Sequence, residues 1–229
     1  IFALFIASTL LMSACAQTPS TPAPQPAKMV ELTDYPSEHL RPRNISIWLP
    51  PGYSATSPTP YPVIYAHDGQ NLFEPGRSYG GVEWQLDETA NRLMSDGTLR
   101  PAIIVGIWNT EDRWQEYAPQ KVIESLPGDT ASEWLGPTLP ELKADAYLKF
   151  ITEDLKPYID ETYATASGPS DTLIMGSSMG GLISLYALSE YPDTFSKAAA
   201  VSIHWPLTEP EGVMAQQADA AQQAYLATG

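Results

Sequence analysis

The chain has 229 residues, of which 43% are hydrophobic, and it carries a formal net charge of -15. This length and apolar content suit one substantial hydrophobic core, so we expect a single α/β domain. The negative charge excludes nucleic acid as a partner, because such a chain repels phosphate backbones, and it disfavours binding to anionic lipid headgroups.

The N-terminal segment "IFALFIASTLLMSAC" is an apolar run that ends at Cys15, the one cysteine of the chain. It is shorter than the roughly 20 apolar residues that a membrane-spanning helix needs. It is typical of the apolar region and cleavage site of a secretory signal. Because "MSAC" resembles a bacterial lipobox, we expect lipidation of Cys15 and a periplasmic or cell-surface lipoprotein. The alternative is an ordinary signal peptide that ends in a chance cysteine.

Residues 16–28, which follow Cys15, are dominated by proline, serine and threonine and show no apolar period. Such a segment is typical of an extended, semi-rigid tether. We therefore expect a lipobox segment at 1–15, a linker at 16–28 and the globular domain at 29–229. The lipid anchor would be the sole contact with a membrane. Because the chain starts at Ile1 rather than methionine, we expect its N-terminus to be incomplete.

Within the globular part, short apolar runs bounded by proline and glycine alternate with segments of helical spacing. Helix breakers and polar residues fill the region from Asn109 to Leu139, which is expected to be a long loop. Pro157 should kink the helix that contains it or end it early. The expected strands are 44–50, 62–69, 101–108, 171–176 and 197–205, and the expected helices are 83–97, 143–163 and 179–192, with a weakly helical tail at 214–229.

This alternation predicts an α/β fold with a mostly parallel sheet and helices on both faces. In such sheets the functional site forms at the carboxyl ends of the strands. The glycine-rich and histidine-bearing turns of this chain fall at such ends.

The stretch "GSSMG", from Gly176 to Gly180, fits the G-x-S-x-G nucleophile elbow. A strained backbone at the middle serine, Ser178, would push its hydroxyl into the cleft. The glycines would let the strand and helix pass closely. The N–H of Met179 and the start of the following helix would stabilise an anion beside Ser178. The alternative is a structural strand–helix turn without chemistry.

Six stretches together resemble the esterase-D-like branch of the α/β-hydrolases, which includes carbohydrate esterases and enterochelin-type siderophore esterases. They are "YAHDGQNLF", "GVEWQLDETANRL", "IIVGIWNTEDRWQEYAPQ", "ADAYLKFITEDLKPYID", "IMGSSMGGLISLYAL" and "VSIHWP". The resemblance covers roughly Leu32 to Pro206. It implies an α/β-hydrolase fold, Ser178 as nucleophile and the N–H of Gln70, in "HDGQN", as the second oxyanion donor beside that of Met179.

Other polar residues near the strand ends receive roles from the same comparison. His67 is expected to pack or hydrogen-bond its loop rather than to act in catalysis. A salt bridge between Arg113 and Glu116 is slightly favoured over contact with substrate. The possible substrate contacts are Asn109, Tyr117, His204 and Trp205, with packing as the alternative for the last two.

The partners that Ser178 needs are not evident in the chain. The fold places an acid and then a histidine after the nucleophile. His204 is the single histidine that follows Ser178, and it comes earlier than the family's base should. None of the later acids follows an apolar strand: Glu190, Asp193, Glu209, Glu211 and Asp219. We therefore expect a fragment, truncated at the C-terminal edge of the sheet, whose base and acid lie beyond Gly229. A short variant that uses His204 is the rival.

The sequence thus predicts a serine esterase that acts on a small-molecule or carbohydrate ester without metal or organic cofactor. An acyltransferase or peptidase on the same scaffold is one alternative, because the elbow does not separate these activities. A catalytically inactive, surface-tethered protein that binds glycans or siderophores is another. It would use tryptophans, most of which we expect in the core: Trp84, Trp108, Trp114, Trp134 and Trp205.

Overall fold

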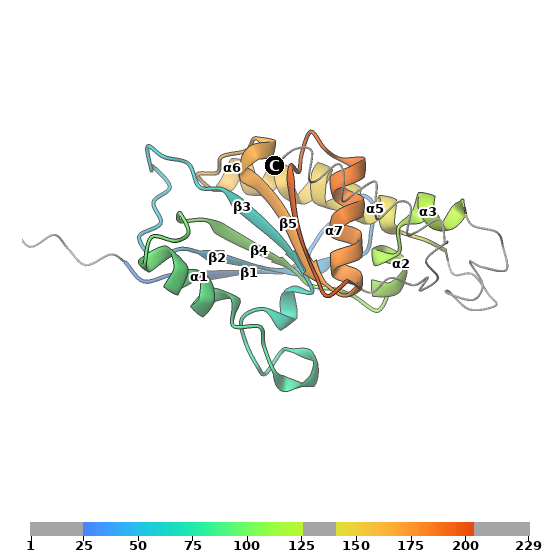
Figure 1. Ribbon diagram of the computed structural model, residues 1–229, viewed down its shortest axis with the longest axis horizontal. Helices are drawn as coiled ribbons and strands as arrows, with labels where there is room; N and C mark the ends of the chain where they lie inside the picture. The colour runs from blue at the N-terminus through green and yellow to red at the C-terminus, as the bar shows by residue number, and fades with distance from the viewer. Residues whose placement is uncertain (1–24, 126–140, 204–229) are drawn as a thin grey trace, which may run out of the picture.

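The computed structural model describes residues 25–125 and 141–203. Its centre is a six-stranded sheet with the order β1-β2-β4-β3-β5-β6 (Figure 1). The strands are β1 (Lys28–Tyr35), β2 (Arg43–Leu49), β3 (Val63–His67), β4 (Ile103–Ile107), β5 (Thr172–Ser177) and β6 (Lys197–Val201).

The pairing of the strands brings several of their carboxyl ends to one edge. β1 pairs with β2, and β2 with β4, in antiparallel fashion. The pairs β3–β4, β3–β5 and β5–β6 are parallel. The prediction of a mostly parallel sheet is therefore confirmed, and the ends of β3, β4 and β5 lie next to one another.

Helices cover both faces of the sheet. On one face a large core joins β2, β3, β4 and β5 to buried residues of 117–123 and 144–159 and to α7 (Met179–Glu190). On the other face a smaller core packs α1 (Leu86–Ser95) and Leu72 against Trp48, Ala66 and Ile104. This two-sided arrangement matches the predicted α/β-hydrolase architecture.

The segment after β4 differs from the predicted loop. It contains α2 (Arg113–Tyr117) and α3 (Gln120–Glu124), which bury Tyr117 and Ile123. Both helices have five residues, too few for a helical period to stand out in the sequence. The remaining residues of the predicted loop, 126–140, lie outside the described part.

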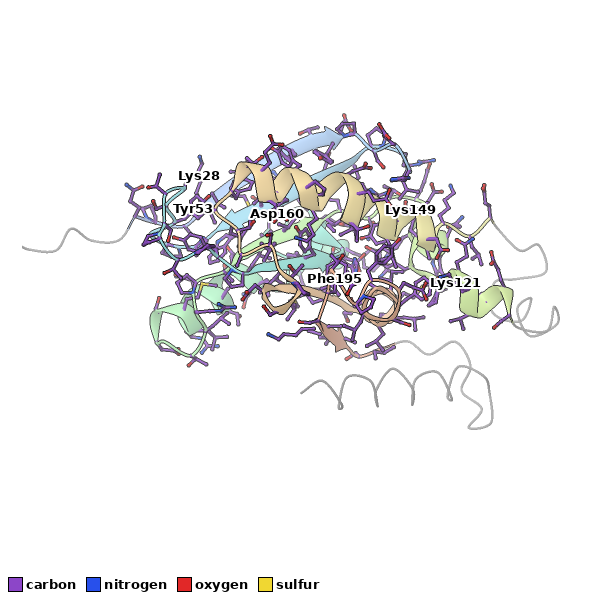
Figure 2. The ribbon with its side chains drawn as sticks, turned by 90° about the horizontal axis from the view of Figure 1, so that it is seen from above. Lys28, Tyr53, Lys121, Lys149, Asp160 and Phe195 are labelled. Carbon is purple, nitrogen blue, oxygen red and sulfur yellow. The ribbon has the colours of Figure 1, made fainter. Side chains whose placement is uncertain are left out.

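The predicted helix at 143–163 is formed, but Pro157 does not end it. α5 (Ala144–Lys149) continues through a π-helical stretch (Phe150–Leu155) into α6 (Lys156–Thr162). Lys149 and Asp160 mark its course in Figure 2. The wider turn lies directly before Pro157, where the missing N–H breaks the regular hydrogen-bond ladder. The proline is therefore accommodated inside a continuous helical segment.

Short single turns complete the described elements: η1 (Gly69–Asn71), η2 (Tyr79–Gly81) and η4 (Pro169–Asp171). None of the helices within the described ranges is long and apolar enough to cross a bilayer. Cys15, the residues of the expected linker up to 24, His204, Trp205 and the expected helical tail lie outside those ranges.

Candidate active site

Ser178 stands between β5 and α7 in a strained backbone conformation, with φ 58 and ψ −122. Residues other than glycine rarely adopt positive φ, so the surrounding structure must hold this one. The Ser178 N–H donates to the carbonyl of Val201 on β6 (3.0 Å), and its carbonyl accepts from the N–H of Gly181 (3.1 Å). The turn is thus fixed on both sides.

Glycine is required where β5 passes α7. A Cβ built on Gly176 would lie 2.6 Å from the carbonyl carbon of Gly180, inside any real contact distance. This close approach is what the G-x-S-x-G spacing predicted. It brings the first turn of α7 directly over the end of the strand.

The N–H of Met179, the first predicted oxyanion donor, lies in the first turn of α7. Met179 is buried, and among the described residues its N–H has no backbone acceptor. The leading amides of a helix are left unpaired by its geometry and carry partial positive charge. An oxygen that becomes anionic next to Ser178 would be stabilised there.

The second predicted donor, the N–H of Gln70, lies in η1 directly after β3. It too lacks a backbone acceptor within the described ranges. A Cβ on Gly69 would meet the carbonyl carbon of Gly106 at 2.5 Å, so this turn is pressed against β4. Because β3 and β5 are parallel neighbours, η1 and the Ser178 turn lie at the same edge of the sheet.

Asp68, between β3 and η1, is a site residue that the sequence reasoning missed. Its buried carboxylate accepts from Arg113 Nε and Nη2 at 2.7 and 2.8 Å and from Asn109 Nδ2 at 2.5 Å. Burial alone would raise the pKa of the Asp68 carboxyl, but these donors hold that pKa below its usual value. The signal in the sequence was the position of all these residues after neighbouring parallel strands.

His67 is fully buried beneath the elbow, as its predicted packing role requires. Its Nδ1 is 2.8 Å from the hydroxyl of Tyr147, and its Nε2 has no partner among the described residues. Desolvation lowers the pKa of His67 to about 3, although Asp68 opposes the shift. The imidazole is therefore neutral at physiological pH.

Two predictions on the segment after β4 were wrong. Arg113 pairs with Asp68 rather than with Glu116, and Glu116 forms a buried bidentate pair with Arg43. Tyr117 does not reach a substrate pocket, because it is fully buried, with its hydroxyl accepting from the Asp68 N–H (3.2 Å). Spacing along the chain could not reveal these partners, since they come from distant strands.

Asn109 differs from Tyr117 in being only half-buried. Its side chain binds Asp68, and its backbone N–H donates to Gln70 Oε1 (3.1 Å). Because it lies next to Gln70, Asn109 stays a predicted substrate contact. His204 and Trp205, the other predicted contacts, lie outside the described residues.

Of the five tryptophans considered for ligand stacking, Trp134 and Trp205 lie outside the described residues, and the other three are less buried than expected. Trp84 and Trp114 are exposed. Trp108 is half-buried: its Nε1 donates to Ser46 Oγ (2.8 Å), and the guanidinium of Arg77 lies 5.5 Å from its ring. A hollow beside Gln70 is lined by Trp108 and by Glu31, Ser46, Phe73, Glu74 and Arg77.

No base for Ser178 is found in the described ranges. They contain His39 and His67; His39 pairs with Glu153 (3.0 Å), and His67 is buried as above. Neither forms a hydrogen bond with the Ser178 hydroxyl. The same ranges hold no cluster of histidine, cysteine and acidic side chains arranged for a metal ion.

A family model described as "Putative esterase" matches residues 37–227. The chain belongs to this esterase family. Among curated relatives of this chain, the ferri-bacillibactin esterase BesA of Bacillus subtilis (strain 168) is 32% identical over 163 residues, which are 66% of this chain and 52% of BesA. The uncharacterized protein YbbA of the same organism is 29% identical over 166 residues, 70% of this chain and 56% of YbbA.

The fold is shared with solved esterase-type structures. An IroE-like serine hydrolase from Shewanella oneidensis superposes with a TM-score of 0.60 at 24% identity, covering 86% of this chain and 55% of that chain. The chain therefore has the predicted α/β-hydrolase-type fold. It spans little more than half the length of its relatives YbbA and BesA, at 56% and 52%.

Proposed function

We propose that the full-length protein is a serine esterase that forms an acyl-enzyme on Ser178. The observation that carries this proposal is the strained backbone of Ser178 (φ 58, ψ −122) at the centre of a G-x-S-x-G turn. A structural turn has no need of such strain, whereas a nucleophile elbow uses it to present the hydroxyl. Membership of the esterase family supports the same reaction class.

In the proposed reaction, Ser178 Oγ attacks the ester carbonyl while a histidine base takes its proton. The N–H groups of Met179 and Gln70 stabilise the oxyanion. The intermediate collapses, and the alcohol leaves with the proton from the histidine. Water then attacks the acyl-enzyme, and Ser178 recovers its proton. The base and its orienting acid would come from parts of the protein outside the described residues.

We further propose that the acyl or alcohol part of the substrate is a siderophore or a carbohydrate. The relative BesA is named as a ferri-bacillibactin esterase, which supports the siderophore alternative. The resemblance to carbohydrate esterases supports the other.

The test compares two adjacent serines in the full-length protein. Ser178→Ala is expected to lower kcat for a p-nitrophenyl ester by at least about 10³-fold, because the nucleophile is lost. Ser177→Ala, one residue earlier, is expected to keep kcat within about threefold, since Ser177 does not carry the acyl group. Initial rates at saturating ester and thermal melting of each variant give the comparison. Equal rates for Ser178→Ala and the unaltered protein would refute the proposal.

A further inference from the structure

The backbone of Asp68 is in the left-handed region, with φ 57 and ψ 44, at the point where β3 passes into η1. Aspartate tolerates this conformation better than most residues with a Cβ, and contacts to both its side chain and its backbone fix it here. Asp68 is separated from the proposed oxyanion donor Gln70 by Gly69 alone. Its conformation therefore sets the direction in which the Gln70 amide points.

Contacts from the segment after β4 hold Asp68 on several sides. Arg113 binds both carboxylate oxygens, and Asn109 binds Oδ1. The Asp68 N–H donates to the hydroxyl of Tyr117, over whose ring the Arg113 guanidinium lies at 4.8 Å. Bidentate, charge-assisted pairs are strongly directional, so they fix orientation as well as position. We call Asp68, Arg113 and Asn109 the Asp68 clamp.

The clamp also contacts the Gln70 side chain and lies against the first turn of α7. The backbone N–H of Asn109 donates to Gln70 Oε1, which ties η1 to the end of β4. On the opposite side, Asp68 Oδ2 lies 3.4 Å from the position that a Cβ on Gly180 would take. Gly180 is in the first turn of α7, next to Met179. The carboxylate is thus packed between Arg113 and the helix that carries the other donor.

We propose that Asp68 is a positioning residue of the oxyanion hole, held by Arg113 and Asn109 so that the Gln70 N–H faces the reacting carbonyl. This inference rests on the proposed function. The Asp68 side chain is only 4% exposed and both of its oxygens are occupied by Arg113, so it acts through Gln70 rather than on substrate.

The kinetic test uses the full-length protein with Asp68→Asn and Asn109→Ala. Loss of one oxyanion donor typically costs 10²–10³-fold in kcat, so we expect about 10²-fold for Asp68→Asn and about 10-fold for Asn109→Ala. KM should change by less than about threefold, because positioning of the oxyanion donor acts on the transition state. Asn109→Ala leaves no buried charge unpaired and keeps the backbone N–H, so it remains informative if Asp68→Asn fails to fold.

The matched control is Glu111→Gln, an exposed carboxylate in the same segment that pairs with Arg41 at the surface. It should leave kcat, KM and the melting temperature unchanged. An Asn109→Ala variant with normal kcat and raised KM would overturn the proposal, since it would make Asn109 a substrate contact. So would Asp68→Asn with kcat unchanged.

Hydrogen exchange tests the Asp68 clamp independently of the proposed reaction. The amides of Asn71 and Leu72 donate to the carbonyls of Asp68 and Gly69 at 2.8 and 3.3 Å. In both clamp variants these two amides should exchange at least about tenfold faster, while those of β5 stay protected. Unchanged exchange at Asn71 and Leu72 would overturn the proposal even if rates fell. If the unaltered protein shows no activity that depends on Ser178, the proposed function fails, and the exchange measurement still decides whether Asp68 holds the turn.

Discussion

At the scale of single residues, His67 makes the protein sensitive to acid. Its pKa is about 3 in the fold and near 6.5 in an unfolded chain, so the unfolded state binds the proton first as pH falls. The contribution of neutral His67 to the free energy of unfolding is complete above about pH 6.5 and is lost as pH falls toward 3. The slope is about 1.4 kcal/mol per pH unit within that window. Asp68 and Arg113, the charged groups facing His67, act on it in opposite directions.

His67→Gln tests this slope, because glutamine cannot be protonated. Urea unfolding of the full-length protein at pH 7, 6, 5 and 4 should show that the variant loses less free energy of unfolding than the unaltered protein as pH falls. His39→Gln, at the surface, should keep the steep dependence because His67 is still present. A difference between His67→Gln and the unaltered protein that is constant with pH would contradict the prediction.

The sequence predicted the local part of the site and missed its distant contacts. The strained turn at Ser178 follows from five consecutive residues, so a motif can indicate it. The partners of Arg113 and Glu116 come from the ends of β3 and β2, and no spacing along the chain specifies which strand end lies nearby. The burial of Tyr117 was missed for the same reason.

At the scale of elements, the crossing of β5 and α7 depends on Gly176. Gly176→Ala places a Cβ 2.6 Å from the backbone of Gly180, which cannot rotate away as a side chain could. We expect a loss of about 3 kcal/mol in the free energy of unfolding, from forced separation of the strand and helix. Gly168→Ala is the matched control: its Cβ would meet nothing within 4 Å, and the φ of Gly168 is −74.

Gly168→Ala should be neutral or stabilising by about 0.4–1 kcal/mol, because alanine restricts the unfolded chain. Urea unfolding of both variants gives the comparison. Equal free energies of unfolding for the two variants would show that β5 and α7 move apart at little cost and that Gly176 is not required where they cross.

Elements with strong apolar runs were predictable, whereas weakly patterned ones were not. β3, β4 and β5 are buried strands whose continuous apolar residues indicate them directly. β1 was missed because its sequence, "KMVELTDY", mixes charged and apolar residues along an edge strand paired with β2. Its formation depends on the neighbouring strand more than on its own propensity.

At the scale of the whole molecule, the alternation of strands and helices predicted a sheet covered by helices. It did not predict the antiparallel pairing of β1, β2 and β4, nor the contacts that join the layers. One such link is the ion pair of Arg43 on β2 with Glu116 on α2, with Nη1–Oε2 and Nη2–Oε1 distances of 2.9 and 2.7 Å. The guanidinium also lies 5.2 Å from the ring of Tyr147 and 4.9 Å from that of Phe150. The sheet, α2 and the helical segment that begins at Ala144 therefore meet at the buried guanidinium of Arg43.

Glu116→Gln would leave that cation without a charged partner, since both side chains are essentially inaccessible, at 1% and 0% exposure. We expect a loss of about 3–5 kcal/mol in the free energy of unfolding of the full-length protein. Glu111→Gln makes the same chemical change in an exposed pair and should leave the free energy of unfolding essentially unchanged. The double variant Arg43→Met/Glu116→Leu should recover much of the loss, because it removes both buried charges together.

Chemical unfolding gives all three values. Similar costs for Glu116→Gln and Glu111→Gln would mean that the Arg43 guanidinium finds water or another partner, and that this pair does not hold the layers together.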